Sequence, residues 1–243
     1  MKAGQLDTSP KRKSYDIVII GGAMYGSSVA WFLTDNPDFD GSVLVIERDP
    51  SYQKSATAHT NSCIRQQFSN PLNVKISQFG AEFIKGFRGF MGNDPRVPDL
   101  TIQSYGYMYL AKTDAFAAQL RAAHRVQQAA GAATQLMTPE QIAAAYPFYA
   151  LDDIKLGSIN LVDEGYWDGG TVFEWWRRSA RERGVEYING EVISMSLSGG
   201  KVQSVTLANG DTIGCDKVVN ATYHASKMDH PDPDEEDTIT CVS

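Results

Sequence analysis

The chain has 243 residues, 42% of them hydrophobic, which is enough to bury a core in one large domain or two small ones. Its formal net charge of −7 argues against nucleic acid as the main partner. The three cysteines, Cys63, Cys215 and Cys241, show no paired spacing, which suits a reducing compartment and gives no sign of a disulfide framework or a zinc site.

The first 14 residues are polar, contain the basic cluster Lys11–Lys13 and lack the apolar centre of a signal peptide. We therefore expect a flexible leader over residues 1–14. No run of the chain approaches the roughly 18 apolar residues that a membrane span requires. We expect a cytoplasmic protein with no membrane span.

A strand, a helix and a second strand follow the leader. Residues 15–20 (YDIVII) form a short apolar run between polar residues and a glycine pair, which is typical of a buried strand. Apolar residues recur at helical spacing after Gly26, and residues 42–47 (SVLVIE) indicate a second buried strand. This order predicts a βαβ unit.

The middle of the chain predicts a long polar loop and then alternating helices and strands. Residues 51–70 have no clear period and are rich in Ser, Thr, Asn and Gln, and a loop of this length usually has a function. Helices are predicted near residues 79–87 and over 113–130, with a strand over 104–111 between them. The pattern Thr138–Gln141 is a capping box that begins another helix.

The last third of the chain predicts one helix and then a β-meander. Residues 168–184 have helical apolar spacing, and short strands follow between residues 185 and 198. Asn209-Gly210 is the signature of a two-residue type I′ hairpin turn. The meander ends in the short buried strand 217–221 (KVVNA).

The turn after the first strand, GGAMYG, resembles a loop that binds the pyrophosphate of a dinucleotide. Gly21 and Gly26 occupy the first and third glycine positions of this motif, and Ala23 occupies the second. In such a turn the backbone N–H groups and the helix dipole face the phosphates. The extra methyl group of Ala23 is acceptable if its φ is negative, and we expect Gly22 to take any unusual dihedral.

Glu47 ends the second strand 21 residues after Gly26, where a carboxylate accepts hydrogen bonds from a ribose diol. Strand, turn, helix, strand and acid in this order predict a site for an adenine dinucleotide. The alternative is that Gly21 and Gly22 only form a tight turn and that Glu47 is a solvated charge.

Two features favour FAD over NAD as that dinucleotide. The polar loop SATAHTNSCIRQQFS, residues 55–69, offers hydroxyls, amides and Arg65, which suit a pyrophosphate, a ribityl chain and the polar edge of a flavin. The second feature is the β-meander, because a nicotinamide-binding domain would continue with further βα units.

The chain resembles the FAD-dependent oxidoreductases of the D-amino-acid oxidase, glycine oxidase and sarcosine oxidase family. The resemblance lies in the first strand with GGAMYG, the second strand with the polar loop, residues 104–111, DEGYWD and the strand VVNA. The chain is especially similar to the branch of FAD-dependent oxidoreductase domain-containing proteins, from about Tyr15 to Ala221. The resemblance implies an α/β fold: a Rossmann-like FAD-binding domain with a β-meander, plus part of a mixed α+β substrate domain. The implied FAD-binding domain is 15–90 and 155–221, and the partial substrate domain is 91–154.

The resemblance also implies which residues bind FAD. The glycine-rich loop holds the pyrophosphate, Glu47 and Arg48 hold the adenosine ribose, and Val192 meets the adenine through its backbone. Residues of the polar loop line the phosphate and the flavin, and the strand that ends at Asn220 and Ala221 passes the cofactor. The implied cofactor-binding residues are Gly21, Gly22, Ala23, Met24, Gly26, Glu47, Arg48, Ser55, Ala56, Thr60, Asn61, Ser62, Val192 and Ala221.

The activity implied by the resemblance is oxidation of the C–N bond of an amine or amino acid by hydride transfer to the flavin. Arg65 is the one catalytic candidate, for steadying the flavin or a substrate carboxylate, and the alternative is a surface salt bridge. Asp163, Glu164 and Asp168 either lie by the active site or form a polar turn before a helix. No metal site is expected.

After Ala221 the sequence departs from the family pattern, so we expect a C-terminal truncation and an acidic, disordered tail over residues 222–243. Two alternatives to an active enzyme stay open: a non-catalytic flavin-binding assembly or interaction protein, and an inactive truncated fragment. The expected partner is a small amine or amino-acid substrate and not a nucleic acid. A protein partner or an oligomer is left open.

Overall fold

The structure is a computed structural model that describes residues 6–222, 227–229 and 238–242. It has two compact units: unit 1 is Met1–Thr60 with Gly170–Ser243, and unit 2 is Asn61–Gly169. The boundaries differ from the predicted ones, because residues 61–90 and 155–169 group with unit 2. The reason is strand pairing: residues 63–64 pair with residues 165–166, and residues 156–160 pair with residues 107–111.

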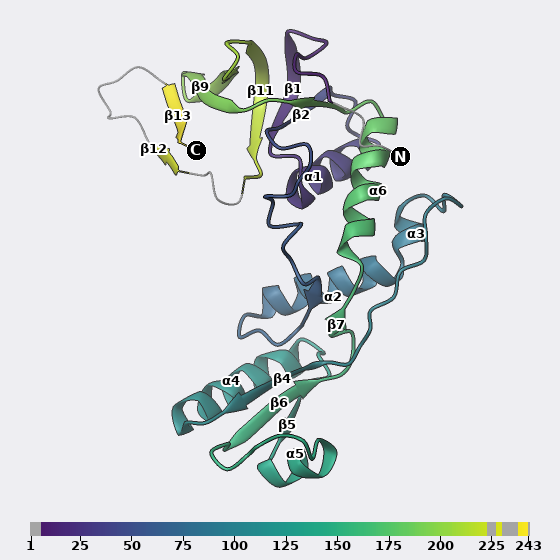
Figure 1. The fold of residues 1–243 in the computed structure, drawn as a ribbon, viewed down its shortest axis with the longest axis vertical. Helices are drawn as coiled ribbons and strands as arrows, with labels where there is room; N and C mark the ends of the chain where they lie inside the picture. The colour runs from purple at the N-terminus through teal and green to yellow at the C-terminus, as the bar shows by residue number, and fades with distance from the viewer. Residues whose placement is uncertain (1–5, 223–226, 230–237, 243) are drawn as a thin grey trace. The chain divides into compact units, whose positions relative to one another are not determined.

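Unit 1 is built on an eight-stranded mixed sheet in the order β12-β13-β9-β10-β11-β1-β2-β8 (Figure 1). The four strands β11, β1, β2 and β8 are parallel, and the β9–β10–β11 meander is antiparallel. The strands are β1 Ser14–Ile20, β2 Val43–Glu47, β8 Glu186–Asn189, β9 Val192–Ser198, β10 Lys201–Leu207, β11 Thr212–Asn220, β12 Lys227–Asp229 and β13 Thr238–Val242. The parallel part with its crossover helix confirms the predicted Rossmann-like α/β fold.

The core of unit 1 lies on both faces of β1 and β2. Val18, Ile19, Leu44 and Val45 are all fully buried, as the continuous apolar runs predicted. Helix α1 (Met24–Asp35) follows β1 directly and buries Trp31 completely. Helix α6 (Gly169–Glu182) contributes the ring of Trp176, which stacks on that of Trp31 with centroids 6.4 Å apart.

Unit 2 has a three-stranded antiparallel sheet in the order β4-β6-β5, with α4 packed along β4 and β6 and α5 packed against β5 and β6 (Figure 1). Side chains cap three of its helices: Asn70 caps α2, Thr113 caps α4 and Thr138 caps α5, where the predicted capping box with Gln141 is present. The elements are β3 Cys63–Ile64, α2 Pro71–Lys85, α3 Phe87–Phe90, β4 Tyr107–Ala111, α4 Asp114–Ala129, β5 Gln135–Met137, α5 Pro139–Ala145, β6 Leu156–Asn160 and β7 Gly165–Tyr166.

Both ends of unit 1 are more ordered than the sequence predicted. In the leader, Leu6 is buried, and Asp7 forms a parallel bridge with Ile188 and accepts a 2.8 Å hydrogen bond from the Asn189 N–H. The expected flexible leader is therefore wrong for residues 6–14, because the open edge of β8 offers backbone partners. Residues 1–5 lie outside the described part.

Two segments of the acidic tail are strands, although we expected no packed structure there. β13 pairs antiparallel with β9, and β12 pairs with β13. The sequence of β13, TITCV, is rich in β-branched residues and finds a partner at the free edge of β9. The tail residues 223–226, 230–237 and 243 lie outside the described residues.

The turn between β10 and β11 is not the predicted type I′ turn. That turn needs a positive φ at both Asn209 and Gly210, and of the two only Gly210 has one, at 93°. The Leu207 N–H reaches the Asp211 carbonyl at 2.8 Å, so the loop is longer than two residues. The Asn209 side chain accepts from the Asp211 N–H at 2.9 Å, which satisfies it without a left-handed backbone.

Candidate cofactor-binding site

A cavity of about 180 Å³ lies in unit 1 at the carboxyl ends of β1, β2 and β11. Ligands of open α/β sheets bind at this edge, because the loops after the parallel strands meet there. Of the fourteen residues implied for the cofactor, these line the cavity: Gly21, Ala23, Glu47, Arg48, Ser55, Ala56, Val192 and Ala221. The fold therefore brings segments up to two hundred residues apart in the chain together at this cavity.

Gly21 is the turn residue that places β1 against the cavity. Its φ is 92°, which L side chains rarely adopt, and its N–H donates to the Ile46 carbonyl at 2.8 Å. A Cβ on Gly21 would lie 3.2 Å from the carbonyl oxygen of Ala221. The unusual dihedral that we expected at Gly22 is therefore at Gly21, because Gly21 is the residue that turns the chain.

Ala23 occupies the second glycine position without backbone strain. It is the N-cap of α1 with φ −72° and ψ −157°, an extended conformation that alanine adopts readily. The Ala23 side chain makes no capping hydrogen bond, and no acidic residue lies in the first turn of the helix. The positive end of α1 thus borders the cavity, since Ala23 is one of the lining residues.

Gly22, Met24 and Gly26 support the cavity without lining it. The Met24 N–H donates to the Thr57 hydroxyl at 3.2 Å, which ties α1 to the polar loop. A Cβ on Gly26 would overlap the Gly21 carbonyl oxygen and lie 3.2 Å from Ile19. The third glycine is therefore required for the helix to approach the strand.

Glu47 is buried at the end of β2 and organises the turn. Its Oε2 accepts from the Gly22 N–H at 2.7 Å, and its Oε1 accepts from the Asp49 N–H at 2.8 Å. A carboxylate has about four acceptor positions, so these two bonds leave room for the hydroxyls of a ribose. Glu47 is therefore not the solvated strand-end charge of the alternative. Its bonds to the turn also give it a structural role in addition to any contact with a ligand.

Tyr52, Lys54 and Thr57 also line the cavity, and no pattern in the sequence distinguished them from the rest of the polar loop. The Tyr52 backbone has φ 57°, and the side chain is buried with its ring 4.9 Å from that of Phe173. Burial raises the pKa of its hydroxyl. The Ser55 hydroxyl donates to the Tyr52 carbonyl at 2.7 Å, so the implied and the missed residue form one turn.

The far wall of the cavity comes from β9 and β11. The Arg48 guanidinium lies 3.6 Å from the Glu191 carboxylate, both half-exposed. The Ala221 N–H donates to the Ile20 carbonyl at 2.9 Å, and Asn220 Oδ1 accepts from the Thr222 hydroxyl at 2.6 Å. These bonds fix the end of β11 beside Gly21.

Thr60 closes the first segment of unit 1 and does not line the cavity, and Asn61 and Ser62 belong to unit 2. Ser62 has φ 49°, and its carbonyl accepts from the Trp167 N–H at 3.0 Å. In the same unit the Arg65 guanidinium lies over the ring of Phe68, 5.1 Å from its centroid, which is not the surface salt bridge of the alternative.

Glu164 is the most unusual polar residue of unit 2, because its carboxylate is completely buried. Its Oε1 accepts from the Gln66 N–H at 2.6 Å and from Asn160 Nδ2 at 2.9 Å, and its Oε2 accepts from Gln67 Nε2 at 3.0 Å. Burial raises the pKa of this carboxyl above its ordinary value, against the opposing effect of these donors. Asp163, by contrast, is paired with Lys85 at 2.8 Å.

Neither a metal centre nor a spanning helix was found where the structure describes the chain. No group of three or more His, Cys, Asp or Glu side chains within that part could hold a metal ion. In the same part, every helix is too short or too polar to cross a membrane.

Comparison with known proteins gives one family. The family described as FAD dependent oxidoreductase matches residues 16–239, which extends past Ala221, where we expected the resemblance to end. FAD-dependent oxidoreductase domain-containing protein 1 of Xenopus laevis is 33% identical over 220 residues, 89% of this chain and 43% of the relative. The protein of the same name from Bos taurus is 34% identical over 92% of this chain and 46% of the relative. The chain thus spans a little under half of these curated relatives.

Solved structures with the same fold are also enzymes by name. L-proline dehydrogenase from P. horikoshii is similar with a TM-score of 0.70 and 25% identity, over 86% of this chain and 53% of that one. Glycine oxidase from Bacillus cereus is similar with a TM-score of 0.64 and 21% identity, over 86% of this chain and 55% of that one.

Proposed function

The chain belongs to the FAD-dependent oxidoreductase family, and from this premise we propose that the cavity of unit 1 holds the adenosine and pyrophosphate parts of FAD. The observation that carries the proposal is the meeting of the amino end of a helix, a left-handed glycine and a buried glutamate at one cavity. A pyrophosphate needs N–H donors and close backbone approach, and a ribose needs a carboxylate acceptor. The residues present fit both requirements.

Each wall of the cavity has a separate task in this proposal. The first turn of α1 and Gly21 would face the pyrophosphate, and Arg48 and Lys54 would add positive charge near it. Glu47 would accept hydrogen bonds from the ribose while it keeps the Gly22 N–H in place. The backbone at Val192 would border the adenine.

The reaction we propose is oxidation of the C–N bond of a small amine or amino acid. A hydride leaves the carbon and a proton leaves the nitrogen, so that the C–N bond becomes a C=N bond; bound FAD supplies the acceptor for the hydride. Arg65, held over Phe68, is the candidate to orient a substrate carboxylate. A structural neighbour named for L-proline and one named for glycine support the amine class.

The first test is the visible absorption spectrum of the purified chain after gel filtration with added FAD. We expect an oxidised-flavin spectrum that comigrates with the protein, and bleaching of it when an amine or amino-acid substrate is added without oxygen. Comigrating flavin that no amine bleaches would support a flavin-binding protein without turnover. A folded chain that stays colourless would overturn the cofactor proposal.

A further inference from the structure

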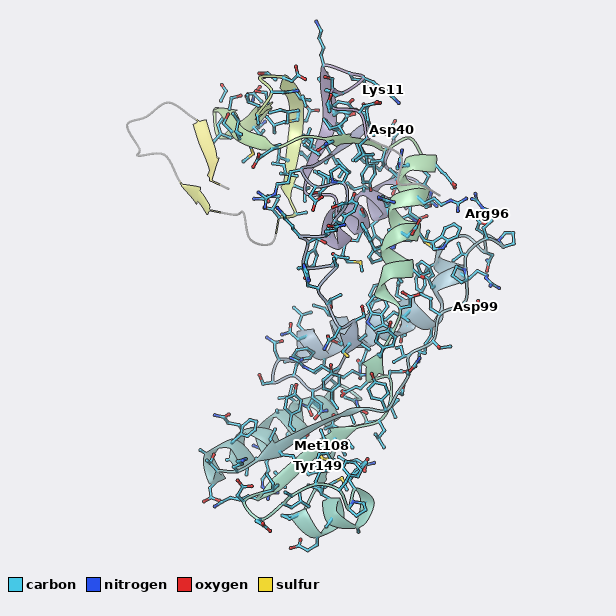
Figure 2. The ribbon with its side chains drawn as sticks, viewed as in Figure 1. Lys11, Asp40, Arg96, Asp99, Met108 and Tyr149 are labelled. Atoms are coloured by element: carbon cyan, nitrogen blue, oxygen red, sulfur yellow. The ribbon has the colours of Figure 1, made fainter. Side chains whose placement is uncertain are left out.

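Unit 1 has a second cleft, at the opposite end of the same strands. Because β1, β2 and β8 are parallel, their amino ends meet at one edge while the FAD cavity lies at the other. This cleft has a volume of about 400 Å³ and lies between the leader, the turn before β2 and the turn from α6 to β8. Figure 2 shows Lys11 and Asp40 at this end of the sheet. We propose that the cleft binds a phosphate-bearing anion.

The cleft has an excess of positive charge. The charged residues that line it are four basic and two acidic: Lys11, Arg12, Arg181 and Arg183, with Asp40 and Glu186. Within the described residues, Lys11, Arg12 and Arg181 have no ion-pair partner inside 4.0 Å, whereas Arg183 pairs with Asp35 at 2.7 Å. Three cations from two distant segments therefore line one cleft and, among the described residues, none of them is held in a close ion pair, although Asp40 and Glu186 line the same cleft.

Hydrogen bonds to Glu186 hold the leader at the cleft. Glu186 Oε1 accepts from the Lys11 N–H at 2.8 Å, and Oε2 accepts from the Tyr15 hydroxyl at 2.6 Å. The Arg12 N–H donates to the same hydroxyl at 3.2 Å. Burial and the bond to Glu186 raise the pKa of Tyr15 to about 12, so its hydroxyl stays protonated and donates to Glu186 at physiological pH. The backbone beneath the two leader cations is therefore fixed.

A phosphoryl group matches this arrangement better than a carboxylate does. The lining carries two more positive than negative charges, and a phosphomonoester carries about −1.5 to −2 near pH 7. Two arginines offer planar donor pairs that suit phosphate oxygens, and Lys11 adds a compact charge. The phosphoryl group could belong to a soluble metabolite or to a lipid headgroup, since both present the same oxygens.

The test is calorimetric titration of the full chain with inorganic pyrophosphate, with and without saturating FAD. We expect Arg181→Gln to weaken binding about tenfold, as for one lost charge-assisted hydrogen bond. The matched control is Lys201→Gln, which removes one exposed positive charge of unit 1 outside either cavity. Arg181 does not line the cavity proposed for FAD, and saturating FAD keeps pyrophosphate out of that cavity, so the loss measured in that arm reports on the cleft.

A second arm distinguishes the source of the phosphoryl group. Phosphatidylcholine vesicles with and without phosphatidylinositol 4-phosphate are sedimented with the chain and with both variants. Binding of pyrophosphate alone would assign a soluble ligand, and Arg181-dependent sedimentation would assign a lipid headgroup. Equal loss in both variants, or no binding in either arm, would overturn the proposal.

Discussion

At the scale of single residues, the two small residues Ala23 and Gly26 of the segment GGAMYG are not equivalent. Ala23 has an ordinary negative φ, so its methyl group requires no strained backbone. Gly26 has no space for a methyl group, because a Cβ there would overlap the Gly21 carbonyl oxygen. The missing second glycine therefore weakens the motif in the sequence without straining the backbone of the turn.

We predict that Gly26→Ala destabilises the chain by about 1–3 kcal/mol, the usual cost of overpacking, and abolishes retention of FAD. Ala23→Gly is the matched control and is expected to change stability by less than about 0.5 kcal/mol. Urea unfolding and the flavin absorbance of the gel-filtered protein measure both effects. Equal behaviour of the two variants would contradict the role of Gly26 in helix–strand packing.

Glu164 gives a prediction about pH, because burial raises its folded pKa above the ordinary value of 4.5. A carboxyl group whose pKa is raised in the folded state binds its proton more tightly there than in the unfolded state. Its contribution to stability therefore falls as pH rises from about 4.5 through the folded pKa. Glu164→Gln removes this titration. We expect the unfolding free energy of the wild type minus that of the variant to fall over this window.

Chemical denaturation of both proteins at several pH values from 4 to 8 measures this difference. Hydrogen bonds lower the pKa values of some exposed carboxyls, such as Asp16 and Glu140. Their contribution to the pH dependence cancels in the difference, because both proteins contain them. A difference that rises with pH would show that the three donors around Glu164 outweigh its burial.

At the scale of elements, the sequence correctly predicted those strands and helix starts that depend mainly on residues close to each other in the chain. The apolar runs of β1 and β2 and the capping box of α5 were all confirmed. The turn type at Asn209 was wrong, because the Asn side chain found a partner in the Asp211 N–H that the sequence pattern does not reveal. β13 was missed because its partner is an edge strand some forty residues earlier.

The residues of the candidate site also differ in whether the sequence alone could identify them. Gly21, Gly26 and Glu47 could be found from spacing alone, because one βαβ unit fixes their geometry. Val192 and Ala221 came only from the resemblance, since their place depends on the order of the sheet. Tyr52 and Lys54 were missed because an irregular loop has no period that shows which side chains face inward.

At the scale of the whole molecule, the division into two units follows from which segments are continuous. Unit 2 is one uninterrupted segment, Asn61–Gly169, whereas unit 1 is assembled from both ends of the chain. Unit 2 also has its own buried cluster, in which Ala111, Leu120 and Leu156 join β4, α4 and β6. A continuous segment with its own core has what a domain needs to fold alone.

We therefore predict that residues 61–168, expressed without unit 1, fold cooperatively. Circular dichroism with urea should show a single transition, and Leu156→Ala should lower its unfolding free energy by about 2–5 kcal/mol, because that side chain is buried in the cluster. Phe148→Ala is the control, since its ring is 77% exposed and its loss creates no cavity. A broad transition unaffected by either change would mean that the core of unit 2 requires the rest of the chain. The cavity that we propose for FAD lies wholly in unit 1, so this segment should retain no flavin even when it is folded.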